Sequence, residues 1–285
     1  MTIRRLARGD PEFPPLLAAI PDPPACLWLR GDAPADVLAR VCAAVVGARA
    51  CSAYGRAVAR SLGRTLAGAG VVVVSGLARG IDGEAHRGAL EAGGLTVAVL
   101  GCGIDRDYPA AHAELARRIV DGGGLVVSEY EAGVEPAPWR FPARNRIIAG
   151  LCAAAVVVEA RERSGALITA DFALEDGREV LVVPGEITSA LSAGTNALLR
   201  LGATPVTRGE DVLEALGVEP SPPDAQRVDG AAGAVLEALR GAATADELVR
   251  LTGLDPGAVA GALVELELAG RVSIDDGEVR SSIAT

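Results

Sequence analysis

The sequence predicts an α/β protein with a doubly wound, mostly parallel sheet, followed by a small C-terminal domain. Half of the 285 residues are apolar but only 3% are aromatic, so aliphatic side chains must form the core, as in a parallel sheet covered on both faces. Short apolar runs alternate with helical patterns along most of the chain, which is typical of strand–helix–strand units. A proline-rich segment, EPSPPD, then separates a shorter C-terminal region.

The elements follow a regular order after residue 40. Residues 1–40 are rich in proline and predict an irregular lead-in packed on the main domain, with a short edge strand at Ala25–Arg30. The strands expected in the main domain, residues 41–218, are Cys42–Val46, Val71–Ser75, Thr96–Leu100, Leu125–Ser128, Ala154–Glu159, Val180–Val183 and Ala203–Val206. The helices expected between them are Ala53–Ala69, Asp82–Ala92, Ala111–Asp121, Ser164–Glu175 and Gly194–Leu201.

A linker at 219–227 and a winged-helix-like domain at 228–285 complete the predicted organisation. Three helices are expected there, at Ala231–Leu239, Thr244–Thr252 and Pro256–Ala269. Thr244 and Glu247 have the spacing of a capping box, and Asp255 is expected to cap the third helix. Strands at Arg271–Ile274 and Glu278–Ser281 flank Asp275-Asp276-Gly277, a hairpin signal.

Two stretches contain arginine but no acidic residue, although the chain carries a net charge of −10. They are Val37–Ile81 and Pro136–Val158. A binding site for a polyanion requires a region with basic residues and without acidic ones, because carboxylates would repel the ligand. The chain is therefore predicted to bind nucleic acid or a nucleotide. Arg56, Arg60 and Arg64 also form a basic stripe on the first helix. Such a stripe is usually a solvated face, but no acid lies four residues away from these arginines.

Glycine-rich and serine-rich turns follow the expected strands at their carboxyl ends, where ligands of doubly wound sheets bind. Gly47-Ala-Arg49 follows the first strand, and Ser75–Asp82 follows the second and opens a helix. Gly76 and Gly80 are expected to let the backbone approach a ligand closely. The alternatives are a surface arginine on the first turn and, on the second, an ordinary turn in which Asp82 caps the helix.

The segment Phe141-Pro-Ala-Arg-Asn-Arg146 combines an aromatic residue with arginines and an asparagine. That composition is typical of a single-strand-binding surface, because bases stack on aromatic rings while arginines contact phosphates. Trp139 adds a second aromatic side chain. The alternative is that Phe141 and Ile147 belong to the core and that the arginines pair with distant acids.

Other classes of site are disfavoured. Five scattered cysteines without a CxxC pair, and only two histidines, argue against zinc and for a reducing compartment. His86 and His112 are expected to be structural. Gly101-Cys-Gly103 starts like a dinucleotide fingerprint, but Arg106 stands where the last glycine is required. Without an apolar leader or a long apolar run, the chain is expected to be cytoplasmic and not to interact with a membrane.

Together these residues resemble the DNA-processing protein A family, DprA, also called Smf. The resemblance covers residues 10–215 in the family's order. It is carried by Gly47-Ala-Arg49 with Ser52-Ala-Tyr54-Gly55, Ser75–Asp82 with His86, Val97–Gly103, Tyr108-Pro109, Ser128-Glu129-Tyr130, Phe141–Gly150, Ser164-Gly165-Ala166 with Thr169-Ala170, Pro184-Gly185, and Gly194-Thr195-Asn196 with Gly202-Ala203.

The resemblance implies an extended Rossmann-like domain that binds single-stranded DNA as a homodimer. It further implies protection of incoming strands during natural transformation and help in loading the RecA recombinase, without catalytic activity or a cofactor. The residues expected to contact DNA are Gly47, Arg49, Ser52, Ser75, Gly76, Arg79, Gly80, Arg87, Arg140, Phe141, Arg144, Asn145, Arg146, Ser164, Gly165, Gly194, Thr195 and Asn196.

The sequence departs from the family pattern in places. Arg87 stands where many members have lysine, and Arg140 is expected to replace a basic residue found just before the phenylalanine in some members. An N-terminal helical domain that many members carry is expected to be missing. Residues 228–285 hold ten acids and four arginines, so this domain is expected to contact protein or regulate, because a DNA-reading winged helix is basic.

Two alternative functions agree less well with the sequence. A nucleoside-monophosphate phosphoribohydrolase of the cytokinin-activating LOG type has a related fold, but its catalytic glutamate corresponds to Leu198 here. A pure protein-interaction scaffold would leave the two acid-free arginine stretches unexplained.

Overall fold

The computed structural model describes residues 2–219, 230–239, 243–268, 272–275 and 278–281. The chain divides into two compact units, Met1–Ser221 and Pro222–Thr285. Most of the expected linker at 219–227 lies outside the described residues.

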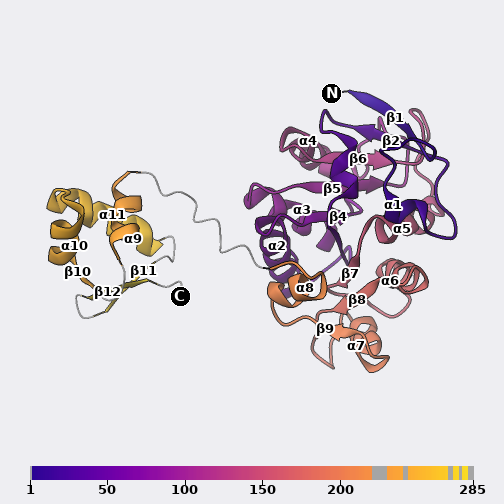
Figure 1. The fold of residues 1–285 in the computed structure, drawn as a ribbon. Helices are drawn as coiled ribbons and strands as arrows, with labels where there is room; N and C mark the ends of the chain where they lie inside the picture. Colours follow the sequence, from indigo (N-terminus) through magenta and orange to yellow (C-terminus); the bar gives the residue numbers. More distant parts are fainter. Residues whose placement is uncertain (1, 220–229, 240–242, 269–271, 276–277, 282–285) are drawn as a thin grey trace. The chain divides into compact units, whose positions relative to one another are not determined.

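A nine-stranded sheet forms the centre of the first unit (Figure 1). The strands are β1 (Ile3–Ala7), β2 (Cys26–Arg30), β3 (Cys42–Val46), β4 (Val72–Ser75), β5 (Thr96–Leu100), β6 (Leu125–Ser128), β7 (Ala154–Val157), β8 (Glu179–Val182) and β9 (Thr204–Pro205). Their order in the sheet is β1-β2-β6-β5-β4-β3-β7-β8-β9. All neighbours from β6 to β9 pair in parallel, whereas β2 pairs antiparallel with both β1 and β6. The predicted mostly parallel sheet is confirmed.

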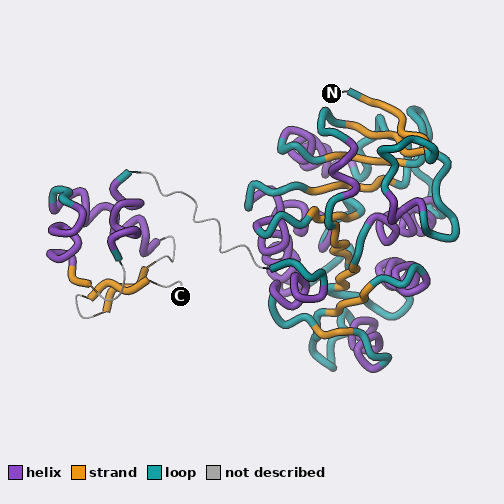
Figure 2. The backbone as a smooth tube through the Cα atoms, in the orientation of Figure 1, coloured by secondary structure: helices purple, strands orange, loops and turns teal. Residues whose placement is uncertain are grey.

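Helices cover both faces of this sheet (Figures 1 and 2). They are α1 (Pro15–Ala18), α2 (Ala53–Gly68), α3 (Ile81–Glu91), α4 (Ala113–Asp121), α5 (Arg140–Leu151), α6 (Gly165–Glu175), α7 (Ala193–Arg200) and α8 (Gly209–Ala215). One core cluster joins α5 and α6 to alternate strand residues such as Val74 and Val99. A second cluster joins α2 and α3 to the intervening strand residues, such as Val73. Successive strand residues point to opposite faces, so these valine-rich strands are buried on both sides.

One predicted element needs correction, and β1, α1, α5 and α8 are elements that the sequence analysis does not predict. Ala25–Arg30 does form a strand, but it is not at the edge, because β1 pairs on its outer side. β1 itself, with the sequence IRRLA, has no clear alternation and was not predicted. Helix α5 was also not predicted, because it contains Pro142. That proline lies in the first turn, where the missing N–H removes no intrahelical hydrogen bond.

The second unit contains helices α9 (Ala231–Ala238), α10 (Ala245–Thr252) and α11 (Pro256–Leu268). A small sheet of β10 (Ala243–Thr244), β12 (Glu278–Ser281) and β11 (Val272–Asp275) completes it. The capping box is confirmed, since Thr244 Oγ1 accepts from the Glu247 amide and Glu247 Oε2 accepts from the Thr244 amide. Asp255 Oδ1 accepts from the Ala258 amide at 3.0 Å. Arg271 and the expected turn at Asp276-Gly277 lie outside the described residues.

Among the described residues, no helix has the length and apolar character that crossing a membrane requires.

Candidate nucleic-acid interface

The carboxyl ends of neighbouring parallel strands bring three separate parts of the chain together. Gly47–Ala50 follow β3, and Gly76–Gly80 follow β4, which ends at Ser75. The first turn of α5 packs beside them, because a Cβ atom added at Gly101, directly after β5, would lie 2.9 Å from the Phe141 ring. The predicted location of the site, at the carboxyl edge of the sheet, therefore coincides with a real cleft.

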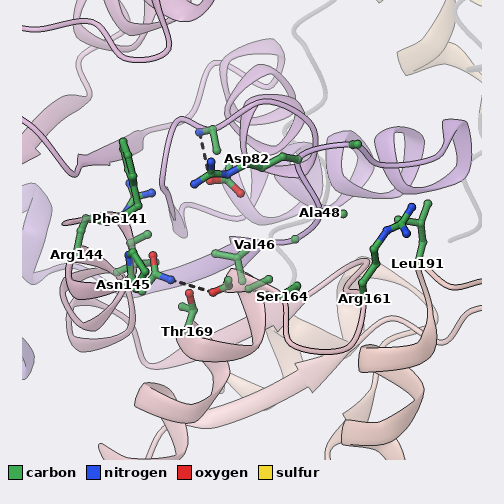
Figure 3. A pocket seen from close by; sticks show the side chains of 18 residues that line it. Val46, Ala48, Asp82, Phe141, Arg144, Asn145, Arg161, Ser164, Thr169 and Leu191 are labelled. Atoms are coloured by element: carbon green, nitrogen blue, oxygen red, sulfur yellow. Dashed lines mark hydrogen bonds between the residues drawn. The ribbon is translucent and has the colours of Figure 1, made fainter. Parts of the chain in front are cut away.

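Two pockets meet in this cleft, with volumes of about 350 and 450 Å³. Both are lined by Arg49, Ala78, Phe141 and Arg144, so these residues form the boundary between them. Figure 3 shows the first pocket, with Phe141 and Asn145 on one side and Arg161 on the other. The first pocket continues to the N-terminus of α6, at Ser164 and Gly165. The second continues to Arg79 and Tyr108–Ala110.

Phe141 is half-buried and lies at the centre of an aromatic and cationic cluster. Its ring stacks on Tyr108, with 5.1 Å between centroids and 28° between planes. The guanidinium carbon of Arg49 lies 5.4 Å from the Phe141 centroid, within the range of a cation–π interaction. The alternative that Phe141 is simply a core residue is therefore disfavoured, because its ring lines both pockets.

Three arginines of the pocket walls remain available to an anion. Arg49, Arg79 and Arg161 are exposed. In the part of the chain that the structure describes, none of them forms an ion pair. Arg161 follows β7 and was not singled out from the sequence, because a lone arginine after a strand carries no distinctive signal.

Arg144 lines both pockets, but unlike the exposed arginines it is buried and hydrogen-bonded to the protein. It is only 4% exposed, and its Nη1 donates to the carbonyls of Gly76, at 2.8 Å, and Val99. Burial lowers the pKa of Arg144 to about 10, and nearby Asp82 opposes that change. Arg144 thus ties α5 to the loop after β4, through Gly76, and to strand β5, through Val99.

Asp82 and His112 hold the turn at Ser75–Gly80. The buried Asp82 carboxylate accepts from the amides of Gly76, at 3.2 Å, and Ala78, at 3.3 Å. Burial raises the pKa of Asp82, while Arg144 and these amides act in the opposite direction. His112 Nδ1 lies 2.8 Å from the carbonyl oxygen of Leu77, a buried residue in the left-handed region at φ 57°. A leucine is strained there, so the surrounding contacts must maintain this conformation.

A side chain added at either turn glycine would meet the protein itself. A Cβ atom at Gly80 would lie 2.3 Å from the carbonyl oxygen of Ala48, and one at Gly76 would lie 2.5 Å from the Arg144 guanidinium. Gly80 therefore lets the loops after β3 and β4 touch each other, and Gly76 makes room for the Arg144 side chain of α5. By contrast, a Cβ atom at Gly165 would meet open space. The close backbone approach predicted for Gly76 and Gly80 thus occurs, but the neighbouring groups are the protein's own.

Several predicted arginines are engaged elsewhere. Arg146 pairs with Glu129 at 2.7 Å and with Asp22 at 3.0 Å, and Arg87 pairs with Glu84 at 2.8 Å. Arg140 donates to the carbonyl of Glu135 and lies over the rings of Tyr130 and Trp139, at 5.0 and 4.7 Å. None of these three arginines lines either pocket.

No acid lies four residues away from Arg60 in the sequence, but the fold brings two acids from another helix to its side chain. Its guanidinium pairs with Glu91 and lies 3.6 Å from Glu84. Both acids belong to α3, which packs against α2, so their proximity depends on the tertiary structure and not on sequence spacing.

The remaining predicted contacts also lie outside the two pockets. Ser75 Oγ donates to the carbonyl of Val45 at 2.7 Å, and Thr195 Oγ1 donates to that of Ser192 at 3.0 Å. Asn196 joins two loops by exchanging hydrogen bonds with the amide and carbonyl of Gly185. All the DNA contacts stay predictions: those at Ser52, Ser75, Gly80, Gly194, Thr195 and Asn196, those at Arg87, Arg140 and Arg146, and those at the residues that line the pockets. The pockets bring together Gly47, Arg49, Gly76, Arg79, Phe141, Arg144, Asn145, Ser164 and Gly165.

Fold and site together define a Rossmann-like α/β protein with a cationic, aromatic-lined cleft at the sheet edge and a C-terminal winged helix. The family model for DNA recombination-mediator protein A matches residues 4–217, and the model for the DprA winged helix domain matches residues 219–278. The chain belongs to the DNA recombination-mediator protein A family, also known as DprA or Smf. The resemblance noted from the sequence is confirmed.

Individual relatives agree with this assignment. A DprA protein of Mycobacterium tuberculosis is 49% identical over 267 residues, which make up 90% of this chain and 68% of that protein. The DNA processing protein DprA of Streptococcus pneumoniae is 46% identical over 206 residues, or 72% of this chain and 71% of that protein. The family consists of DNA-processing proteins and not of LOG-type hydrolases. At the position of the LOG catalytic glutamate, this chain has the buried Leu198.

Solved structures show the same fold. The X-ray structure of DprA from S. pneumoniae superposes with a TM-score of 0.70 at 44% identity, covering 75% of this chain and 74% of that one. A structure of DNA processing protein A from Helicobacter pylori, described for its single-stranded DNA binding mode, gives a TM-score of 0.68 at 29% identity. It covers 76% of this chain and 96% of that one.

Proposed function

We propose that this protein binds single-stranded DNA across the two pockets of the sheet-edge cleft. One observation carries the proposal: Arg49 and Phe141 meet at the boundary of two pockets whose walls also hold Arg79 and Arg161. Rings and guanidinium planes stack on unpaired bases, which contributes about 1–3 kcal/mol per base, and arginines bind phosphates without regard to sequence. A duplex offers no free base faces, so single strands are preferred.

The biological role we propose follows the family. The H. pylori relative is described as binding single-stranded DNA, and the family model is that of a recombination mediator. We propose that the chain protects strands taken up in natural transformation and helps load the RecA recombinase onto them in the cytoplasm. A homodimer formed by the Rossmann-like unit is part of this proposal. Exposed apolar side chains support it, namely Leu174, Ile187 and Leu201.

Fluorescence anisotropy with a labelled poly-dT oligonucleotide, repeated across a salt series, tests DNA binding. Duplex DNA of matched length serves as competitor. We expect affinity to fall with salt, with a logarithmic slope of about 0.7 per neutralised phosphate. Arg49→Ala should weaken binding and reduce this slope by about one such increment.

Arg64→Ala is the matched control, because it removes the same charge from the exposed face of α2, away from both pockets. It should leave the slope unchanged. Absence of binding at low salt, or equal effects of the two substitutions, would contradict the proposed site.

A further inference from the structure

Glu159 is a buried acid two residues after the end of β7 and directly after the second acid-free stretch, Pro136–Val158. It is 5% exposed. Its carboxylate accepts two hydrogen bonds from Ser52, one from the amide to Oε2 at 2.9 Å and one from the hydroxyl to Oε1. Its backbone carbonyl accepts from the Ala48 amide at 2.7 Å. Glu159 is therefore hydrogen-bonded to residues on both sides of Arg49, Ala48 before it and Ser52 after it.

The start of α2 is built around this carboxylate. Ser52 is the N-cap of α2, and its Oγ accepts from the Gly55 amide at 2.9 Å. A Cβ atom at Gly55 would lie 2.4 Å from Oε2 of Glu159. A helix N-terminus favours a negative charge and commonly binds phosphate. Here the protein's own carboxylate occupies that place, so the Ser52 hydroxyl and amide are engaged before any DNA arrives.

We infer that Glu159 is a positioning residue for DNA binding: it clamps the Gly47–Ser52 loop so that the Arg49 guanidinium stays over the Phe141 ring. This inference rests on the proposed function. Its structural basis is that Ala48 and Ser52, which bracket Arg49, are both bonded to Glu159. Without this clamp, Arg49 must lose more conformational freedom when it engages a phosphate or a base.

The charge of Glu159 and its role in positioning Arg49 predict opposite effects of Glu159→Gln on DNA affinity. Glu159 is an acid near a site for a polyanion, so electrostatics alone predict that Glu159→Gln strengthens DNA binding. Loss of the clamp predicts that it weakens binding, because the neutral amide cannot accept both Ser52 hydrogen bonds with the same strength. The sign of the change therefore distinguishes the two roles.

The test compares the wild-type chain, Arg49→Ala, Glu159→Gln and the double variant by poly-dT anisotropy across a salt series. Glu162→Gln is the matched control, because it removes an exposed carboxylate three residues away. We expect Glu159→Gln to weaken binding roughly 3- to 10-fold, as is typical of coupled neighbours, and to lower the salt slope as Arg49→Ala does. The double variant should bind no more weakly than Arg49→Ala alone. Glu162→Gln should bind equally well or more tightly.

The inference is overturned if Glu159→Gln binds poly-dT as tightly as Glu162→Gln or more tightly. It is also overturned if the losses of binding free energy in Glu159→Gln and Arg49→Ala add fully in the double variant. If the wild-type chain does not bind poly-dT, or if Arg49→Ala leaves the affinity unchanged, the proposed function is contradicted. The inference, which rests on that function, is then contradicted as well. Should Glu159→Gln not fold, Gly55→Ala displaces the carboxylate without changing the charge. That variant must then reproduce the weaker binding and lower slope, and wild-type behaviour would overturn the inference.

Discussion

Charged side chains in the cleft and in the loops behind it fall into two groups that differ in burial. Asp82, Arg144 and Glu159 are buried and hydrogen-bonded to the backbone of the loops. Arg49 and Arg79 are exposed on those same loops. Buried charges need partners, and here the partners are loop amides and carbonyls, so these groups rigidify the loops that carry the exposed cations.

Phe141→Leu is expected to weaken single-strand binding by about 1–3 kcal/mol, roughly 5- to 150-fold, because leucine retains volume but cannot stack on a base. The measurement is poly-dT anisotropy, together with the thermal midpoint to verify folding. Trp139→Leu is the control, since Trp139 is 62% exposed and lines neither pocket. Equal losses of poly-dT affinity in Phe141→Leu and Trp139→Leu would show that the bases do not stack on Phe141 in particular.

His86 should make the protein sensitive to mild acid. Burial lowers its pKa to about 3 from the ordinary 6.5, and the nearby His112, Arg87 and Arg144 act in the same direction. Below pH 6.5 the His86 imidazole therefore binds a proton in the unfolded chain but stays neutral in the folded chain. The free energy of unfolding thus decreases as the pH falls from about 6.5 toward 3.

Chemical denaturation of wild type and His86→Asn at pH 7 and pH 5 measures this effect. At about 1.4 kcal/mol per pH unit, wild type should lose about 2 kcal/mol more than the variant between these two values. Parallel losses would show that His86 titrates normally in the folded protein.

At the scale of elements, α2 and α3 pack unusually closely behind the cleft. A Cβ atom at Gly88 would lie 2.0 Å from the Arg60 carbonyl oxygen, and one at Gly63 would lie 2.3 Å from that of Ala85. Each helix thus presents a glycine to the backbone of the other. Because α2 begins at the Arg49 loop and α3 begins at the Ser75–Gly80 turn, this contact sets the distance between the two loops.

Gly88→Ala should destabilise the protein by about 1–3 kcal/mol, since the added methyl group meets backbone that can move only if the helices separate. Gly68→Ala, at the open end of α2, should be neutral or stabilising by up to about 1 kcal/mol. Thermal or urea unfolding of both variants measures the difference. A Gly88→Ala protein as stable as Gly68→Ala would contradict the close helix contact.

The whole molecule consists of two units with separate cores. Val235, Leu248, Val259 and Leu263 are among the side chains that form the core of the C-terminal unit. The three other clusters lie in the first unit. Residues 228–285 carry a net charge of −6, with ten acids and four arginines, which opposes DNA binding. All residues of the two pockets lie in the first unit.

Removing residues 222–285 should therefore leave a folded unit whose affinity for poly-dT is equal to or higher than that of the full chain. Circular dichroism and anisotropy on both forms measure this outcome. A folded but non-binding truncated form would show that the C-terminal unit supplies part of the DNA site, against the charge argument.

The sequence by itself determined the parallel sheet, the edge at which the site lies, the winged-helix pattern and the family. Valine-rich runs and loop motifs are local, and the side-chain period of a strand makes burial on both faces readable from the residues alone. Only the tertiary structure decided which arginines are free. Arg60, Arg144 and Arg146 lie in or near the same stretches as the free cations. Their partners come from α3 for Arg60, from the loop after β4 and strand β5 for Arg144, and from Glu129 and Asp22 for Arg146. Such pairing depends on distances in space between segments far apart in the chain, and for the same reason the clamp between Glu159 and Ser52 is invisible in the sequence.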